Sequence, residues 1–151
     1  MGINEDWEDY WDVGRLTQSD MASASAELGL IFPPDFVLLM TQHQGQIPPR
    51  RWVRVFQGPK TKFGPIMHFR KGRGGEIVTT REIFMRHGYP KELVPFADSG
   101  SQTHWALDYR ASRERPKVCL VVPELGYDDA DSIVEVADSI TDLLSMLESA
   151  E

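Results

Sequence analysis

The spacing of hydrophobic and polar positions changes several times along this chain, and each change predicts a boundary between elements. In residues 28–46 the pattern indicates the end of one helix, a loop, a short second helix and a turn. Gly29 suits the left-handed position that follows a helix, and Pro33 and Pro34 favour a break and a new first turn. Gly45 follows apolar positions at helical spacing, so we expect it to end the second helix with a positive φ.

The first residues combine acidic side chains with aromatic ones. Trp7, Tyr10 and Trp11 are spaced i, i+3 and i+4, which predicts that residues 5–13 form a short helix with one aromatic face. An acidic and aromatic segment of this kind can bind in the groove of a partner. We interpret it instead as a terminal helix that packs on the protein's own core.

Helix signals also occur further along the chain and at its end. Ser19 and Asp20 are expected to cap a helix over residues 21–28. Ser139 is expected to cap the last helix in the same way. The apolar stripe of that last helix consists of Ile140, Leu143, Leu144 and Leu147.

Short segments with alternating or continuous apolar residues lie between these helices and predict strands. They cover residues 51–56, 65–69, 76–79, 103–109 and 118–122. The last is apolar on both faces, so we expect it to be central in a sheet with Cys119 buried. After the third segment, Thr80 is expected to cap a helix that turns Ile83 and Phe84 inward. Residues 133–137 fit a strand or a helix by periodicity alone.

Helices near the two ends and strands in the middle predict an α+β fold with a central, mostly antiparallel sheet. The helices are then contributed mainly by the N- and C-terminal segments. The length of 151 residues is typical of one domain, which we expect to span residues 1–151, and it allows a self-sufficient core.

Charge is unevenly distributed along the chain, whose net charge is −7. Residues 1–49 carry −7, residues 50–91 carry +9, and residues 118–151 carry −9, with nine acids and no base. Such segregation is typical of a binding surface. A second interpretation is that the basic middle and the acidic ends lie side by side and partly neutralise each other.

No motif for catalysis or for a cofactor is present in the sequence. The four histidines are scattered over different expected elements and, together with Cys119, lack the spacing of a zinc site. The glycine-rich stretch 71–75 lacks the spacing of a phosphate-binding loop, so we interpret it as a solvated hairpin turn. We therefore expect no metal, no cofactor and no enzymatic activity, although any two acids can still meet in space as a hydrolytic pair.

The chain has a single cysteine, which excludes an intramolecular disulfide. Its first residues lack the apolar core of a secretory signal. Its longest apolar runs have five residues, far too few to span a membrane. We therefore expect a cytoplasmic protein without a membrane partner.

Several of these motifs, in this order and spacing, resemble the SUKH superfamily, which includes the fungal Smi/Knr regulators of cell-wall synthesis and many bacterial immunity proteins. The family has an Asn-Gly-Gly turn after its short helix. Gln44, Gly45 and Gln46 match it here, so that the first and last positions depart from the pattern. Further matches are residues 94–98, 107–109 and 137–144. The resemblance covers residues 22–147 and implies that residues 133–137 form a strand.

The resemblance implies a non-enzymatic module that binds another protein, and in particular an immunity protein that neutralises a nuclease or deaminase toxin. A regulator of cell-wall assembly that acts through protein contacts is the first alternative. Another is a nucleic-acid-binding protein that uses the basic residues 50–91, with Trp52, Phe56 and Phe69 as stacking groups. A pI near 5.1 argues against nucleic acid as the partner.

The acidic loop before the strand at residues 133–137 is the predicted partner-binding site. It consists of four acids and one tyrosine as an aromatic anchor: Glu124, Tyr127, Asp128, Asp129 and Asp131. Toxins that act on nucleic acid need a positive surface, and an acidic inhibitor can occupy that surface. The alternative interpretation is a solvated loop whose acids only aid solubility.

Overall fold

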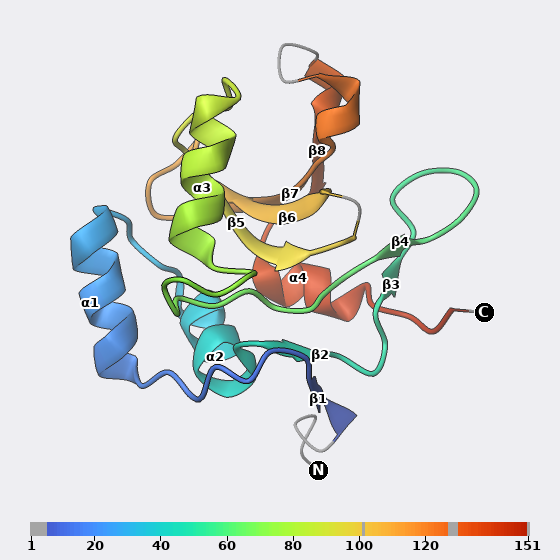
Figure 1. Ribbon diagram of the computed structural model, residues 1–151. Helices are drawn as coiled ribbons and strands as arrows, with labels where there is room; N and C mark the ends of the chain where they lie inside the picture. Colours follow the sequence, from blue (N-terminus) through green and yellow to red (C-terminus); the bar gives the residue numbers. More distant parts are fainter. Residues whose placement is uncertain (1–5, 101, 127–129, 151) are drawn as a thin grey trace.

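The computed structural model describes residues 6–100, 102–126 and 130–150. Its main sheet has four antiparallel strands in the order of the chain (Figure 1). They are β5 (Leu93–Asp98), β6 (His104–Asp108), β7 (Lys117–Val121) and β8 (Ile133–Ala137). β6 and β7 occupy the centre of this sheet, which confirms the central strand predicted around Cys119, and that cysteine is buried. The fold is α+β, as predicted.

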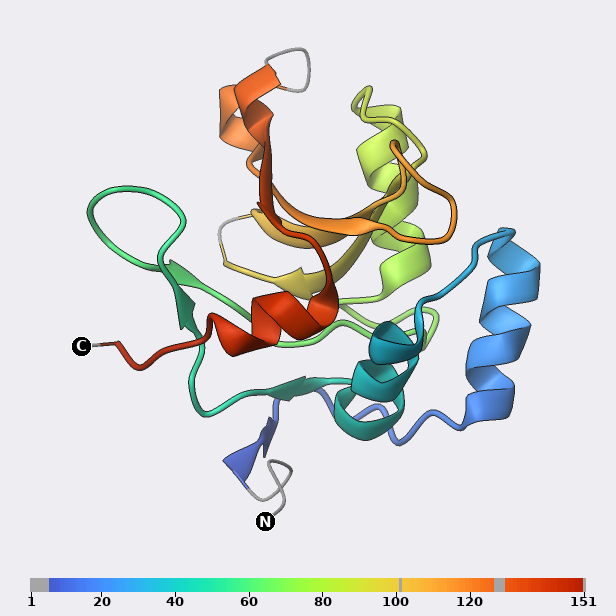
Figure 2. The same cartoon turned by 180° about the vertical axis from the view of Figure 1, so that it is seen from behind.

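The two faces of this sheet are covered very differently. Because side chains alternate along a strand, Trp105 lies on one face of β6 and the next residue, Ala106, lies on the other. The first face packs against α2 (Pro34–His43) and α4 (Ile140–Ser145) and forms the larger core. The second face packs against α3 (Ile77–Arg86) in a smaller, separate core. Figures 1 and 2 show α3 on one side of the sheet and α2 and α4 on the other.

The helices predicted at residues 21–28 and after Ser139 are confirmed, the first with an earlier start. α1 (Gln18–Leu28) begins earlier than expected, because Thr17 and Asp20 form a reciprocal capping box. α4 begins after Ser139, whose hydroxyl accepts a hydrogen bond from the Asp142 amide at 3.0 Å. The apolar stripe predicted for the last helix packs on the core through Ile140, Leu143, Leu144 and Leu147.

Residues 76–79, predicted to be a strand, form the start of α3 instead. Glu76 caps this helix, since its carboxylate accepts hydrogen bonds from the backbone amides of Val78 and Thr79 at 2.7 and 3.1 Å. A cap of this kind satisfies amides that the first turn of a helix leaves without partners. The helix therefore begins ahead of Thr80, the predicted cap.

The helix predicted at residues 5–13 is wrong. None of its described residues is α-helical, and β1 (Glu8–Asp9) pairs antiparallel with β2 (Gln46–Ile47). The backbone amides of this segment donate to a turn that is distant in the sequence instead of to carbonyl groups within a helix, so they are still satisfied. We call residues 6–15 the N-terminal strap. In Figure 1 it runs beside β2, below α2.

The three aromatic residues of the strap lie in different surroundings, which explains why their helical spacing was misleading. Trp7 stacks on His43, with 3.7 Å between the ring centroids. Trp11 lies over Gly75, where its indole leaves no room for a Cβ atom. Tyr10 is largely exposed. The three rings therefore do not share one buried face.

The strap lies closest to the turn after α2 at a glycine, Gly45. Gly29 and Gly45 have the positive φ values predicted for them, 67° and 77°. The carbonyl oxygen of Gly45 accepts hydrogen bonds from the amides of Tyr10 and Trp11, both at 2.9 Å. A Cβ atom on Gly45 would lie 2.8 Å from a methyl group of Val13. Glycine is therefore required there both for the backbone angle and for the close approach of the strap.

The middle of the chain is less regular than predicted. β3 (Trp52–Val53) and β4 (Thr61–Lys62) form a short two-stranded ribbon, so only part of the strand predicted at residues 51–56 exists. Residues 65–69 make two isolated bridges, one to β5 and one to the residue before α3. Pro59, two residues before β4, and Pro65, three residues after it, lack the backbone N–H donors that a longer ladder needs.

Candidate functional site

The loop between β7 and β8 is framed by two short turns of 3₁₀ helix, Pro123–Leu125 and Ala130–Ser132. The amide of Val122 donates to the carbonyl oxygen of Ser132 at 2.8 Å, which closes the base of the loop. The loop therefore leaves and re-enters the sheet at adjacent points, and its first turn stands on the same side of the sheet as α3 (Figure 1).

The predicted acidic site falls on this loop. Glu124 and Asp131 are exposed, and Glu124 accepts a hydrogen bond from the Thr103 hydroxyl at 3.3 Å. That bond fixes one acid of the loop against the turn between β5 and β6. The remaining predicted residues lie outside the described part of the chain: Tyr127, Asp128 and Asp129.

An open cavity of about 470 Å³ lies between this loop and α3, over the second face of the sheet. We call it the α3 groove. Its lining comes from three separate stretches of the chain: Thr80, Ile83, Phe84, His87, Tyr89, Gln102, His104, Pro123 and Gly126. This groove was not predicted from the sequence, because no single motif contains its residues.

The floor of the groove is aromatic. Phe84 is buried there, with its ring centroid 5.5 Å from that of Tyr89 and 5.6 Å from that of His104. Burial lowers the pKa of His104, against the opposing effect of the nearby Asp98 carboxylate. The imidazole Nδ1 of His104 lies 3.0 Å from the carbonyl oxygen of Gln102. The lowered pKa favours a neutral imidazole in the floor.

The wall that α3 contributes to the groove carries an exposed apolar side chain. Phe84 faces inward as predicted, but Ile83 does not: it is 41% exposed and lines the groove from α3. On the loop, Leu125 is 47% exposed and lies between two lining residues. The helical pattern of the sequence had placed Ile83 in the core, so nothing in the sequence indicated this exposed wall.

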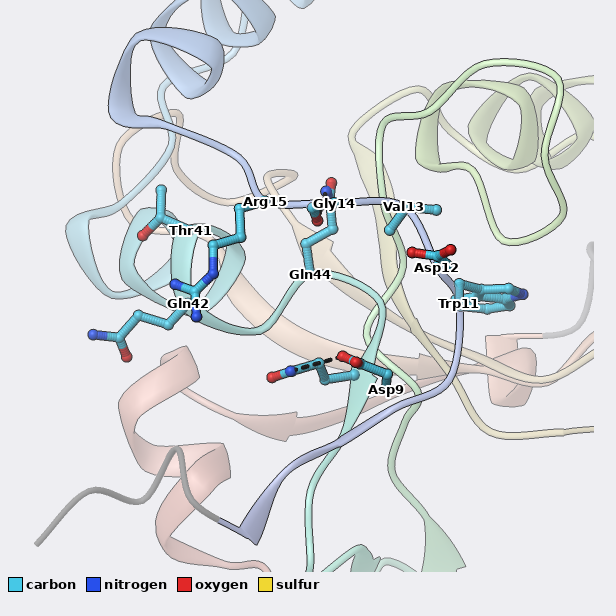
Figure 3. A pocket seen from close by; sticks show the side chains of 10 residues that line it. Asp9, Trp11, Asp12, Val13, Gly14, Arg15, Thr41, Gln42 and Gln44 are labelled. Atoms are coloured by element: carbon cyan, nitrogen blue, oxygen red, sulfur yellow. Dashed lines mark hydrogen bonds between the residues drawn. The ribbon is translucent and has the colours of Figure 1, made fainter.

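A second cavity, of about 250 Å³, lies between the N-terminal strap and the end of α2 (Figure 3). The side-chain amide of Gln44 donates to the carbonyl oxygen of Gly14 at 3.1 Å. That of Gln46 donates to a carboxylate oxygen of Asp9 at 3.0 Å, as the dashed line in Figure 3 shows. Gln44 and Gln46 therefore hold the strap, and we interpret this polar cavity as part of that attachment.

The basic middle segment lies beside the acidic ends, which supports the second interpretation of the charge pattern. Lys60 forms an ion pair with Glu148 at 2.7 Å, and Lys71 with Glu27 at 3.8 Å. Of the proposed stacking groups, Phe69 is packed against the core. The structure thus gives little support to a nucleic-acid surface along residues 50–91.

Within the described ranges, no group of three or more histidine, cysteine, aspartate or glutamate side chains is placed to hold a metal ion. Burial raises the pKa of the Cys119 thiol, which keeps it protonated and unreactive. Among the same residues, no helix has the length and apolar character needed to cross a membrane.

The fold and the site define an α+β protein whose sheet buries one face in a large core and carries an apolar groove beside an acidic loop on the other. The sequence model of the SMI1 / KNR4 family (SUKH-1) matches residues 15–146. The chain belongs to this family, which confirms the resemblance to the SUKH superfamily. A comparison with curated proteins gave no match. The matched residues contain the groove, whereas most of the N-terminal strap precedes them.

Proposed function

We propose that this protein is a non-enzymatic module of the cytoplasm that binds another protein, and that it serves as an immunity protein which neutralises a nuclease or deaminase toxin. Membership of the SUKH-1 family supports a binding module of this general type. The observation that carries the proposal further is the acidic loop, exposed at Glu124 and Asp131, beside an open apolar groove. Together they provide the charged rim and apolar centre that are typical of protein interfaces.

The charge of the loop fits a basic partner. The last 34 residues, 118–151, contain nine acids and no base; Lys60 and Lys117 pair with three of these acids, whereas Glu124 and Asp131 of the loop face solvent. An enzyme that acts on nucleic acid presents a positive surface to phosphate. Opposite charges on the two proteins would speed their encounter, while buried contacts would slow their separation.

A regulator of cell-wall assembly would use the same geometry, so the identity of the partner decides between the two roles. Affinity capture from the native organism, followed by mass spectrometry, identifies that partner. We expect a toxin domain that stops the growth of a test bacterium when it is expressed alone. Co-expression of this protein should restore growth. Capture of a cell-wall enzyme instead of a toxin would contradict the immunity role and favour the regulatory one.

The contribution of the loop is tested by reversing three of its acids, with Asp128→Lys, Asp129→Lys and Asp131→Lys. A control with the same change in net charge reverses exposed acids on other elements, with Glu8→Lys, Glu27→Lys and Glu114→Lys. We expect the loop variant to bind the captured partner about tenfold more slowly at low salt, and the control much less so. Equal association rates for the two variants would show that the loop is not the binding site.

A further inference from the structure

The α3 groove lies where the sheet is least covered. Its floor belongs to the smaller core, in which Phe84 and Tyr89 pack over Ala106, Cys119 and Val121. A single helix, α3, protects this face, whereas two helices and the strap protect the opposite face. The cavity of about 470 Å³ remains beside that helix and is within the size range of pockets that accept ligands or anchoring side chains.

The lining of the groove favours an apolar occupant. Ile83 on α3 lines it and keeps nearly half of its surface in water. Covering apolar surface is worth roughly 25 cal/mol per Å², so an apolar side chain that fills the groove gains energy from Ile83 and from the aromatic floor. A charged side chain in the same place would lose its hydration, because no lysine, arginine, aspartate or glutamate is among the lining residues.

The charge next to the groove favours cations beside that apolar side chain. Glu124 lies between the lining residues Pro123 and Gly126, and Asp131 is exposed at the other end of the loop. The described residues of the loop, 122–126 and 130–131, contain two acids and no base. A lysine or arginine beside an apolar anchor would therefore meet opposite charge at Glu124, outside the groove, while the anchor stays dry.

We propose that the α3 groove binds one large aromatic or aliphatic side chain of a partner protein, flanked in the partner's sequence by lysine or arginine. The inference rests on the proposed function in so far as the occupant is a protein segment. The anchor inserts beside Ile83 over the aromatic floor, and a flanking cation lies against Glu124. Deeply buried aromatic anchors of this kind provide much of the energy in protein interfaces.

Short synthetic peptides test this without the native partner. The probe is acetyl-Gly-Lys-Trp-Lys-Gly-amide. Two matched peptides replace the tryptophan by alanine or both lysines by glutamate, and free indole serves as the small-molecule control. Each is titrated into the full-length, ¹⁵N-labelled protein and followed by NMR. We expect the lysine–tryptophan peptide to shift amide signals around the groove, and to bind about tenfold more tightly than either matched peptide.

Two variants of α3 locate the binding. Ile83→Lys adds a charge to the lip of the groove, whereas Met85→Lys adds the same charge at a residue of the same helix that is outside the lining and equally exposed, at 40%. We expect Ile83→Lys to abolish binding and Met85→Lys to change it less than twofold. A second pair, Leu125→Lys and Leu38→Lys, repeats the comparison on other elements, should a helix variant fail to fold.

Several results would overturn the inference. These are equal binding to Ile83→Lys and Met85→Lys, equal binding of the tryptophan and alanine peptides, equal binding of the lysine and glutamate peptides, and indole binding as tight as that of the peptide. The last would indicate a small-molecule site. None of these results depends on a toxin. Failure to find a partner that this protein neutralises would therefore overturn the proposed function, while the peptide titrations decide the inference separately.

Discussion

The four-stranded sheet and the N-terminal strap are stabilised in opposite ways. Strands β5 to β8 follow one another in the sequence and each pairs with the next. Their side chains fill two separate cores, one on each face of the sheet. The strap is extended and depends on a few individual contacts: the turn at Gly45, the stack of Trp7 on His43 and the space over Gly75. The sheet therefore spreads its stability over many contacts, whereas the strap concentrates its attachment at a few positions.

The largest effect is expected in the sheet. Leu120 in β7 is fully buried, so Leu120→Ala should lower the free energy of unfolding by about 2–5 kcal/mol. The same change at Leu38, which is 55% exposed, should cost less than about 0.5 kcal/mol. Urea denaturation followed by circular dichroism measures both. Similar losses in the two variants would mean that β7 does not occupy the centre of the core.

Gly45→Ala should have the next largest effect. Both Gly45 and Gly29 have positive φ values, so alanine at either position costs about 1–2 kcal/mol for the backbone. At Gly29 a Cβ atom meets nothing within 4 Å, whereas at Gly45 it meets Val13 and the backbone of Trp11 at 2.8 and 2.9 Å. Gly45→Ala should therefore lower the free energy of unfolding more than Gly29→Ala, again in urea. Equal losses would show that the strap moves aside at no cost.

Gly75→Ala should release the end of the strap while the sheet stays intact. Its control is Gly72→Ala, which also has a positive φ but meets no atom within 4 Å. In the first variant the added methyl group displaces the indole of Trp11, so the NMR signal of its indole N–H should shift and exchange faster with solvent. The signal of the buried Trp105 should stay unchanged in both. An unshifted Trp11 signal in Gly75→Ala would contradict the observed packing.

The smallest effect concerns pH. Burial lowers the pKa of His43 below its ordinary value of 6.5, and the charge of Arg15 acts in the same direction, against the hydrogen bond with Gln46. The unfolded chain then binds a proton more readily than the folded one, so the free energy of unfolding falls as pH decreases below about 6.5. His43→Gln removes this contribution. The stability difference between wild type and variant should therefore shrink between pH 7.5 and 5.5, and a constant difference would contradict the prediction.

The sequence predicted best what local patterns control. The central strand around Cys119, the cap at Ser139 and the positive φ of Gly29 and Gly45 all depend on residues close together in the chain. Apolar runs, capping hydroxyls and glycines at helix ends act within a few residues, so they can be recognised without knowledge of the fold.

The failures came from contacts between distant residues. The strap was predicted to be a helix because its aromatic spacing fits one, but its amides bind the carbonyl oxygen of Gly45. The start of α3 was missed because Glu76 is an unusual cap, although its carboxylate reaches two backbone amides. The α3 groove was not predicted at all, since Ile83, His104 and Pro123 line one cavity only after the chain has folded.

The outer edge of β8 has a consequence for self-association. In the described part of the chain, no further strand pairs with this edge, and an open edge can template the addition of another chain. Here Lys117 binds both Glu135, in β8, and Asp138, just after it, and the pairing of β8 with β7 shifts register. Charges on and beside β8 oppose edge-to-edge pairing with a second sheet. We therefore expect this edge not to template fibres at high protein concentration, which leaves the groove face free for a different molecule.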